Sequence, residues 1–437
     1  MRSIQTLLSA GTVLPVDPQD SILVDHSIAI DQGRIIDLLP TAEALQQYQA
    51  NQHIEYDEHI LMPGLINGHS HAAMSLLKGL GSDLPLQRWL NENIWPTESR
   101  WVDAQFVNDG SELAIAEMLR GGITCFNDMY FFPEVTARAA SAIGMRSVVG
   151  MIIIEFPSAY ASTVDEYFAK GLSLFDQYKA DPLVNVVFAP HAPYTVADDT
   201  LKKLSSYANE LDLAVHMHVH ETTTEIEDSL KEHGKRPIAR LHELGLMNPN
   251  LLAVHMTQLT QEEISLVAEA GVTVVHCPES NLKLASGFCP VNELLKNDIK
   301  VILGTDGSAS NDDLDLFSEM RTAALLAKGV SGDAAAFNAR LAVRAATLDA
   351  AIALGLGDEI GSLEIGKAAD IIAIDCSSIE AQPIYDAYSH LLYAVDRAQV
   401  EDVFVAGRQL LRKRSLTTIS EDEIITKAHS WRERIQP

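Results

Sequence analysis

Residues 60–71 read Ile-Leu-Met-Pro-Gly-Leu-Ile-Asn-Gly-His-Ser-His, an apolar run that ends in the pair His69 and His71. Residues two apart on a β-strand project to the same side, with a rise of about 3.3 Å per residue. The two imidazoles can therefore converge on one point at the end of a strand, as a metal ion requires. A His-x-His pair alone is weak evidence for a metal site. It gains weight here because later segments are also apolar runs that end in a potential ligand or proton-transfer group.

Strand-like segments recur through the middle of the chain and alternate with helical patterns. Eight such segments are found, at residues 60–67, 123–128, 147–154, 184–190, 214–220, 251–255, 272–276 and 300–304. Helical patterns separate most of them, for example at 108–120, 200–211, 237–244 and 261–270. Eight β-then-α units of about 30–45 residues predict a parallel (β/α)₈ TIM barrel. A doubly wound open sheet is the alternative, but no Gly-x-Gly-x-x-Gly loop follows the first strand.

Both ends of the chain differ from the middle, because they consist of short strand-like segments and turns. Examples are residues 27–30 and 34–38 near the start, and 369–374 and 400–405 near the end. We therefore expect an α/β fold in which both chain termini form a small composite β-sandwich domain beside the barrel. The expected boundaries are 1–61 for its N-terminal part, 62–364 for the barrel and 365–437 for its C-terminal part.

Composition narrows the class of protein. The net charge of the 437 residues is -28, which repels polyanions, and no Lys/Arg cluster offers a phosphate-binding surface, so we expect no nucleic-acid partner. The four cysteines form no Cys-x-x-Cys pair, which argues against a disulfide framework or a cysteine zinc site. No signal-peptide core and no run near 18 apolar residues occurs, so we expect a cytoplasmic protein without a membrane span.

Histidines gather at the predicted strand ends, where TIM barrels carry their functional residues. Of the 15 histidines, eight lie there: His69, His71, His191, His216, His218, His220, His255 and His276. The last strand is followed by Thr305-Asp306. Three neutral imidazoles and a carboxylate suit Zn²⁺ or a similar divalent ion, which lowers the pKa of a bound water to about 7.

On the fifth strand, alternation alone does not identify the metal-binding histidine, because His216, His218 and His220 share parity and face the same side. The end of the strand and Glu221, three residues beyond, favour His218. We expect His220 to orient ligands or substrate and His216 to be structural.

Other strand ends carry further roles. Glu221 and His255 are candidates for the proton transfers of hydrolysis at an sp² carbon, and His276 is expected to hydrogen-bond within the barrel. A two-metal site commonly has a carboxylated lysine at the end of the fourth strand, where this chain has His191, so we expect one metal.

These motifs together resemble the amidohydrolase superfamily. The resemblance rests on His69-Ser70-His71, His218-Val219-His220-Glu221, His255, Gly304-Thr305-Asp306, the opening segment 62–69 and the return segment 361–370. Residues 94–98, 127–131, 190–194 and 277–284 are similar, more narrowly, to the 5'-methylthioadenosine/S-adenosylhomocysteine deaminases.

The resemblance implies a role for each matching residue. His69, His71, His218 and Asp306 would hold one Zn²⁺ per subunit, with Fe²⁺, Mn²⁺ and Ni²⁺ left open. Glu221 would protonate the purine N1, and His255 with Asp306 would orient and deprotonate the attacking water. Glu98 would bind the ribose hydroxyls and His191 the purine N3. A homodimer or homotetramer is the implied assembly.

The segment after the third strand bears on the substrate. Relatives that accept S-adenosylhomocysteine can hold its carboxylate with arginines there, whereas residues 150–157 of this chain are apolar with one acid. A carboxylate would lack an ion-pair partner, so we favour deamination of 5'-methylthioadenosine to 5'-methylthioinosine and ammonia, with adenosine or S-adenosylhomocysteine as further substrates. The alternatives are a deaminase or chlorohydrolase of an s-triazine, guanine, 8-oxoguanine or pterin, and a metal-free scaffold that binds partners.

Overall fold

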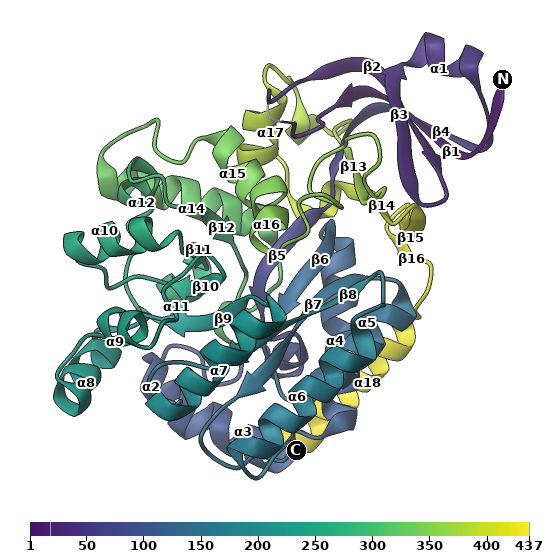
Figure 1. Ribbon diagram of the computed structural model, residues 1–437. Coiled ribbons are helices and arrows are strands. Elements are labelled where there is room, and N and C mark those ends of the chain that lie inside the picture. Colours follow the sequence, from purple (N-terminus) through teal and green to yellow (C-terminus); the bar gives the residue numbers. More distant parts are fainter. Residues whose placement is uncertain (18, 437) are drawn as a thin grey trace.

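Eight parallel strands form the centre of the molecule, in the computed structural model that describes residues 1–17 and 19–436. They neighbour one another in chain order (Figure 1): β5 (Leu65–Ser70), β6 (Ile123–Asp128), β7 (Arg146–Ile153), β8 (Val184–Pro190), β9 (Val215–Val219), β10 (Leu251–His255), β11 (Thr273–His276) and β12 (Val301–Leu303). Nearly every residue of these strands is buried, as expected for a parallel sheet covered on both faces. The predicted TIM barrel, with a β-domain built from both termini, is confirmed.

Two glycines allow the first and last strands to meet. A Cβ on Gly68 would lie 2.8 Å from the Leu303 carbonyl oxygen, and a Cβ on Gly304 would lie 2.7 Å from the His69 nitrogen. The Asp306 amide donates to the His69 carbonyl at 3.1 Å. Backbone closeness at these glycines therefore brings the ends of β5 and β12 together, and with them His69 and Asp306.

Helices surround the barrel and cover its mouth. Those following or flanking the barrel strands are α4 (Ala104–Arg120), α5 (Pro133–Ile143), α6 (Val164–Tyr178), α7 (Asp198–Leu211), α8 (Thr223–His233), α9 (Pro237–Glu243), α10 (Gln261–Ala270), α11 (Pro278–Lys283), α12 (Val291–Lys296), α13 (Ser308–Asn311), α14 (Leu316–Ser331), α15 (Ala339–Ala345) and α16 (Leu348–Ala353). Between β5 and α4 the chain forms η1 (Ala72–Leu77), α2 (Leu86–Trp89), the π-helix η2 (Leu90–Ile94) and α3 (Trp95–Trp101). The Asp103 side chain caps α4 by accepting from the Phe106 amide.

The first predicted strand is divided between two sheets. Residues 60–63 end β4 of the terminal sheet, where Pro63 is paired with Ile371, and the barrel strand begins only at Leu65. The division falls at Gly64, where a Cβ would lie 2.1 Å from Thr124 Oγ1. The apolar run 60–67 is continuous because both sheets bury it, so hydrophobicity alone did not reveal the break.

Both chain ends contribute to the second sheet. Its strands are β1 (Arg2–Val13), β2 (Leu23–Asp31), β3 (Arg34–Pro40), β4 (Tyr48–Pro63), β13 (Ile371–Asp375), β14 (Val400–Val405), β15 (Arg408–Arg412) and β16 (Ser415–Leu416), and the connections include α1 (Thr41–Gln47), η3 (Ile379–Ala381), α17 (Ala387–Tyr393) and η4 (Arg397–Gln399). The strands form one continuous sheet in which β4 lies between β1 and β13. The boundaries near residues 61 and 365 stay predictions.

The last helix, α18 (Glu421–Ile435), leaves this sheet and returns to the barrel, where Figure 1 shows it in yellow beside α4. Trp431 of α18 is buried, donates to Asp109 Oδ2 at 3.0 Å and meets the Phe106 ring at 5.2 Å. The C-terminal segment therefore contributes to the barrel as well as to the small sheet.

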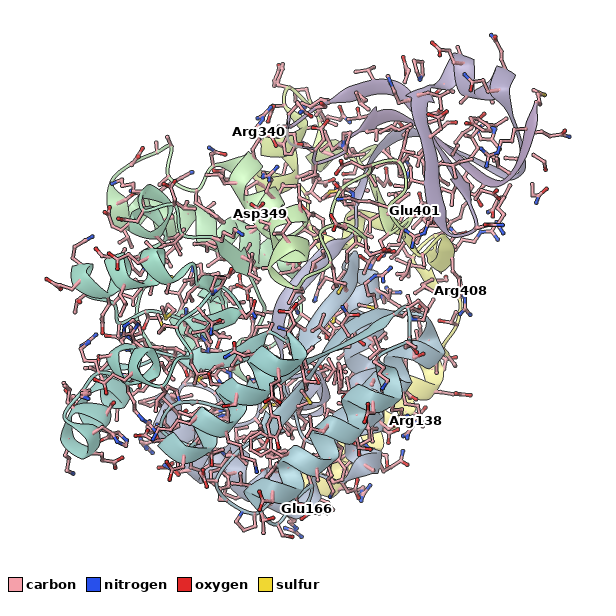
Figure 2. The ribbon with its side chains drawn as sticks, viewed as in Figure 1. Arg138, Glu166, Arg340, Asp349, Glu401 and Arg408 are labelled. Atoms are coloured by element: carbon pink, nitrogen blue, oxygen red, sulfur yellow. The ribbon has the colours of Figure 1, made fainter. Side chains whose placement is uncertain are left out.

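A buried ion pair lies where the barrel meets the terminal sheet. Arg146, at the start of β7, donates from Nε to Asp370 Oδ2 at 3.0 Å and from Nη2 to Oδ1 at 3.3 Å. Other charged side chains are exposed, such as Arg138 on α5 and Arg408 on β15 (Figure 2). In the described part of the chain, no helix is long and apolar enough to cross a membrane.

Candidate metal centre

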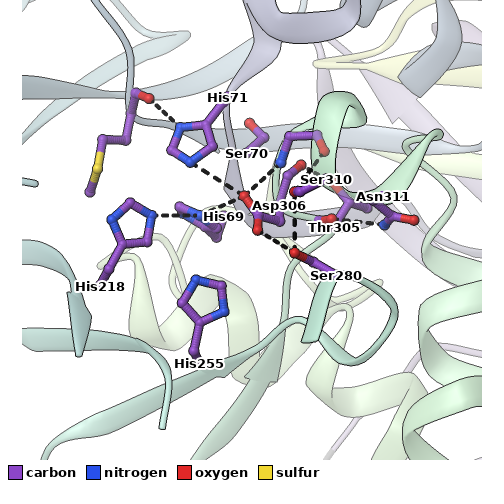
Figure 3. Close-up of polar contacts among 12 residues, drawn as sticks. His69, Ser70, His71, His218, His255, Ser280, Thr305, Asp306, Ser310 and Asn311 are labelled. Carbon is purple, nitrogen blue, oxygen red and sulfur yellow. Dashed lines mark hydrogen bonds and ion pairs between the residues drawn. The ribbon is translucent and has the colours of Figure 1, made fainter. Parts of the chain in front are cut away.

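Three histidines and an aspartate converge where β5, β9 and β12 end (Figure 3). Asp306 Oδ1 lies 3.4 Å from His69 Nε2 and 3.3 Å from His71 Nε2. His69 Nε2 lies 3.2 Å from His218 Nε2. The first strand thus supplies two ring nitrogens, the fifth supplies one, and the segment after the eighth supplies a carboxylate oxygen.

The other ring nitrogen of each histidine has its own partner. His71 Nδ1 donates to the Met129 carbonyl at 2.5 Å, and His218 Nδ1 donates to the His191 carbonyl at 2.7 Å. A neutral imidazole carries one proton, so a proton held at Nδ1 leaves a lone pair at Nε2. His71 therefore presents a bare Nε2 toward Asp306, and His218 presents one toward His69.

Three of the six separations among these four donors fit neighbouring ligands of one tetrahedral ion. Zn²⁺ holds nitrogen and oxygen ligands at about 2.0–2.1 Å, which places tetrahedral neighbours about 3.3 Å apart. The three measured separations are 3.2, 3.3 and 3.4 Å. Burial lowers the pKa of His69 to about 4, which keeps that ring neutral and able to act as a ligand. The donor set accordingly fits a divalent cation.

Asp306 is held in a fixed orientation. Its Oδ2 accepts from Ser280 Oγ at 2.6 Å and its Oδ1 accepts from the Gly307 amide at 2.7 Å. Burial by itself would raise the pKa of Asp306, but contact with His69 and His71 outweighs it and keeps that pKa well below its usual range. Its φ of 61° is left-handed, a strain of about 1–3 kcal/mol that these hydrogen bonds sustain.

Glu221 and His255 lie beside the four donors. Glu221 Oε2 is 3.8 Å from His255 Nε2, and Glu221 Oε1 accepts from Ser286 Oγ at 3.3 Å. Burial raises the pKa of Glu221, which favours a protonated carboxyl able to donate. His255 Nδ1 donates to Asn281 Oδ1 at 2.8 Å, so its Nε2 is free to accept a proton. The pair offers one acid and one base in the same cavity.

The cavity above these groups has a volume of about 570 Å³ and is mostly apolar. Its apolar lining is Met74, Leu86, Trp89, Leu90, Ile94, Trp95, Val102, Met129, Phe131, Ile152, Ile154, Phe156, Pro157, Ala159 and Leu284. Among the described residues that line it, none is lysine or arginine. A ligand with a large apolar part and few charges fits this lining.

Glu98 and His191 both line the same cavity. Glu98, on α3, is half-buried and accepts from the Tyr130 hydroxyl at 2.7 Å, while its burial raises its pKa to about 7. His191 follows β8, its Nδ1 lies 3.0 Å from Thr195 Oγ1, and burial lowers its pKa to about 3. The structure therefore brings the predicted site residues other than His69 into the lining of one cavity. His69 is fully buried and contacts His218 and Asp306, which belong to that lining.

Three buried histidines differ from expectation. His220 is expected to orient ligands or substrate and His216 to be structural, yet it is His216 Nε2 that lies 2.8 Å from His69 Nδ1. His220 instead contacts the Gln258 carbonyl and the Ile238 amide. Within the described part of the chain neither ring nitrogen of His276 has a hydrogen-bond partner, so its expected bond in the barrel is wrong.

Sequence reasoning also missed the residues that hold the site residues in place. Tyr130, Ser280 and Asn281 lie in segments 127–131 and 277–284. These segments supported the resemblance to the deaminases, but no role was predicted for these three residues. Only the shared parity of His216 and His218 on one strand pointed to a second inward-facing imidazole.

Comparison with known proteins adds independent evidence. The model of the "Amidohydrolase family" matches residues 60–410. A 5-methylthioadenosine/S-adenosylhomocysteine deaminase of Teredinibacter turnerae is 49% identical over 433 residues, covering 99% of this chain and 98% of that protein. One of Thermodesulfovibrio yellowstonii is 40% identical, covering 98% of each.

Solved structures share the fold, and one that is 50% identical to this chain contains bound zinc. An adenosine deaminase from Xanthomonas campestris with bound zinc superposes with a TM-score of 0.98 at 50% identity, covering 100% of this chain and 99% of that one. The zinc-bound atrazine chlorohydrolase of Arthrobacter aurescens has a TM-score of 0.91, covering 98% of this chain and 100% of that one; at 24% identity this likeness shows the fold alone.

Proposed function

The chain belongs to the amidohydrolase family, and from that premise we propose that it is a zinc-dependent deaminase converting 5'-methylthioadenosine to 5'-methylthioinosine and ammonia. The observation that supports the proposal is the convergence of His69, His71, His218 and Asp306, with Glu221 and His255 beside them. Full-length relatives named for this reaction support it.

We assign the ion to His69, His71, His218 and Asp306. When bound there, zinc supplies a Lewis acid that makes water a nucleophile at neutral pH. The backbone carbonyls that accept from Nδ1 of His71 and His218 leave Nε2 of each neutral ring available to the ion, and the low pKa of Asp306 keeps its carboxylate ionised.

Glu221 and His255 carry the protons of the proposed reaction. As water oxygen bonds to C6, His255 Nε2 takes one water proton and the Glu221 carboxyl gives its proton to N1. When the C6–N bond breaks, His255 returns its proton to the departing amine, and the new hydroxyl proton restores the Glu221 carboxyl. Ammonia and the C6 carbonyl result, and both side chains regain their starting state.

Glu98 and the apolar wall select the rest of the substrate. The Glu98 carboxylate accepts hydrogen bonds from the ribose hydroxyls, and His191 contacts the purine N3. A methylthio group packs well against Ile152, Ile154 and Phe156, whereas the carboxylate of S-adenosylhomocysteine would be buried among these side chains without a cation. The neutral 5' substituent is therefore preferred.

Ammonia release from a panel of compounds tests the proposal. The zinc-loaded protein should act on 5'-methylthioadenosine with a higher kcat/KM than on S-adenosylhomocysteine or adenosine, and should leave guanine and s-triazines unchanged. Glu98→Ala should raise the KM for nucleosides strongly. Activity confined to guanine or triazines, or a Glu98→Ala variant with unchanged KM, would contradict the nucleoside assignment.

The implied homodimer or homotetramer stays a prediction. Size-exclusion chromatography with light scattering measures the assembly directly, and a monomeric mass would refute it.

A further inference from the structure

His69 differs from the other two histidines in what its second ring nitrogen contacts. His71 and His218 direct Nδ1 at backbone carbonyls, whereas His69 directs Nδ1 at Nε2 of His216, 2.8 Å away. His216 lies on β9, two residues before His218, so both rings face the barrel interior and His216 lies deeper. Neither His69 nor His216 has any exposed surface.

Metal binding by His69 requires one particular position for its ring proton. His69 offers a lone pair at Nε2 only if its single proton is on Nδ1, and that proton then needs an acceptor. His216 Nε2 is the acceptor within reach. The proton of His216 is then on its own Nδ1, which has no partner within the described part of the chain. This arrangement therefore leaves the buried Nδ1–H of His216 without a hydrogen bond, which is rare and calls for a reason.

The reverse arrangement of the same pair would exclude the ion. If His216 donated to His69 Nδ1, the His69 proton would move to Nε2 and point at His218 Nε2 and Asp306 Oδ1, 3.2 and 3.4 Å away. The pair therefore has two neutral arrangements, and only one of them leaves His69 able to bind a metal.

We propose that His216 is a positioning residue that holds His69 in the metal-binding tautomer and orientation through the hydrogen bond from His69 Nδ1. The inference rests on the metal ligands of the proposed function, but not on its substrate. Each of the three histidines donates from Nδ1 to an acceptor. Two of these acceptors are backbone carbonyls, so only His216 can be removed by a substitution.

Zinc affinity is the measurement that tests this role. His216→Leu removes the acceptor and keeps an apolar side chain of moderate size, while His216→Gln can return an acceptor oxygen near the Nε2 position. Zinc affinity is measured by competition with a chelator, together with the rate of zinc loss and the Tm of the metal-free protein. The matched control is His276→Leu, which removes another fully buried barrel histidine that contacts none of the proposed ligands through a hydrogen bond.

We expect His216→Leu to bind zinc about 10–100-fold more weakly, as is typical when the partner of a metal-bound histidine is lost. His216→Gln should recover most of that loss, and His276→Leu should bind like the unchanged protein. Equal zinc affinity in His216→Leu and the unchanged protein would overturn the proposal, as would an equal loss in His276→Leu. If His216→Leu does not fold, two other results refute the proposal. One is a His216→Gln variant whose zinc affinity is weakened while its metal-free Tm is unchanged. The other is a His216→Met variant whose zinc affinity is undiminished. An unchanged protein that binds no zinc would instead refute the metal site itself.

Discussion

Removing one hydroxyl group from Tyr130 should make ribose binding depend on pH in a new range. The Tyr130 hydroxyl donates to Glu98 Oε1 at 2.7 Å and so stabilises the carboxylate against the burial that raises the pKa of Glu98 to about 7. A hydrogen bond to a charged group is worth about 1.5–3 kcal/mol. At about 1.36 kcal/mol per pKa unit, Tyr130→Phe should raise the pKa of Glu98 by about 1–2 units.

The magnitude follows from the ionised fraction. With a pKa of about 7, about three quarters of Glu98 is a carboxylate at pH 7.5; after a rise of about 1.5 units, about a tenth is. The KM for 5'-methylthioadenosine should therefore rise about eightfold at pH 7.5, because only the carboxylate accepts from both ribose hydroxyls. The rise should fade toward pH 9.5, where Glu98 is ionised in both proteins, while kcat changes little.

Steady-state kinetics from pH 6 to 9.5 measure this effect. Glu98→Gln has no titrating group at this position, so its KM should be high and lack the pH dependence attributed to Glu98. Tyr160→Phe serves as the matched control, since Tyr160 is buried but is neither bonded to Glu98 nor part of the cavity lining. A Tyr130→Phe variant whose KM is unchanged at pH 7.5, or equally raised at pH 7.5 and 9.5, would refute the reasoning.

Three further outcomes are expected. Glu221→Gln should lower kcat by about 10²–10⁴-fold at unchanged zinc content, since it removes the proton donor; turnover within a few-fold of the unchanged enzyme would exclude Glu221 as the acid. Asp370→Ala should destabilise the protein by about 3–5 kcal/mol in denaturant unfolding, because Arg146 stays buried without its carboxylate. The double variant Arg146→Leu/Asp370→Leu should recover much of that loss; a double variant no more stable than Asp370→Ala would contradict this explanation. Stripping the metal with a chelator should lower the Tm, and zinc at about 1,000 times its Kd should restore about 4 kcal/mol; an unchanged Tm would show that no ion binds the folded state.

Strand periodicity and apolar runs were enough to predict the barrel. The strand-like segments 123–128 and 184–190 are separated by helical patterns, and their bounds coincide with β6 and β8. The His69 and His71 pair also followed from alternation, because two residues apart on a strand share a face. Local chemistry along the chain contains this information, since it depends on neighbours in sequence.

Histidine parity on β9 shows where local information ends. His216, His218 and His220 are equivalent by alternation, but β9 ends at Val219 and His220 has a left-handed φ of 55°. That turn carries the His220 ring to the Gln258 carbonyl, whereas His216 stays in the strand and contacts His69, a proposed metal ligand. The backbone turn depends on contacts with the following loop, which the pattern of the strand does not encode.

By itself the sequence determined that imidazoles and carboxylates lie at the ends of eight parallel strands, because strand order and side-chain parity are local properties. Only the tertiary structure decided that Asp306 approaches His69 and His71 within 3.4 Å, that Tyr130 meets Glu98, and that His216 rather than His220 contacts a ligand. Those pairings join residues 32 to 237 positions apart. They follow from closure of the barrel at Gly68 and Gly304 and from the return of α3 over its mouth, which no local pattern specifies.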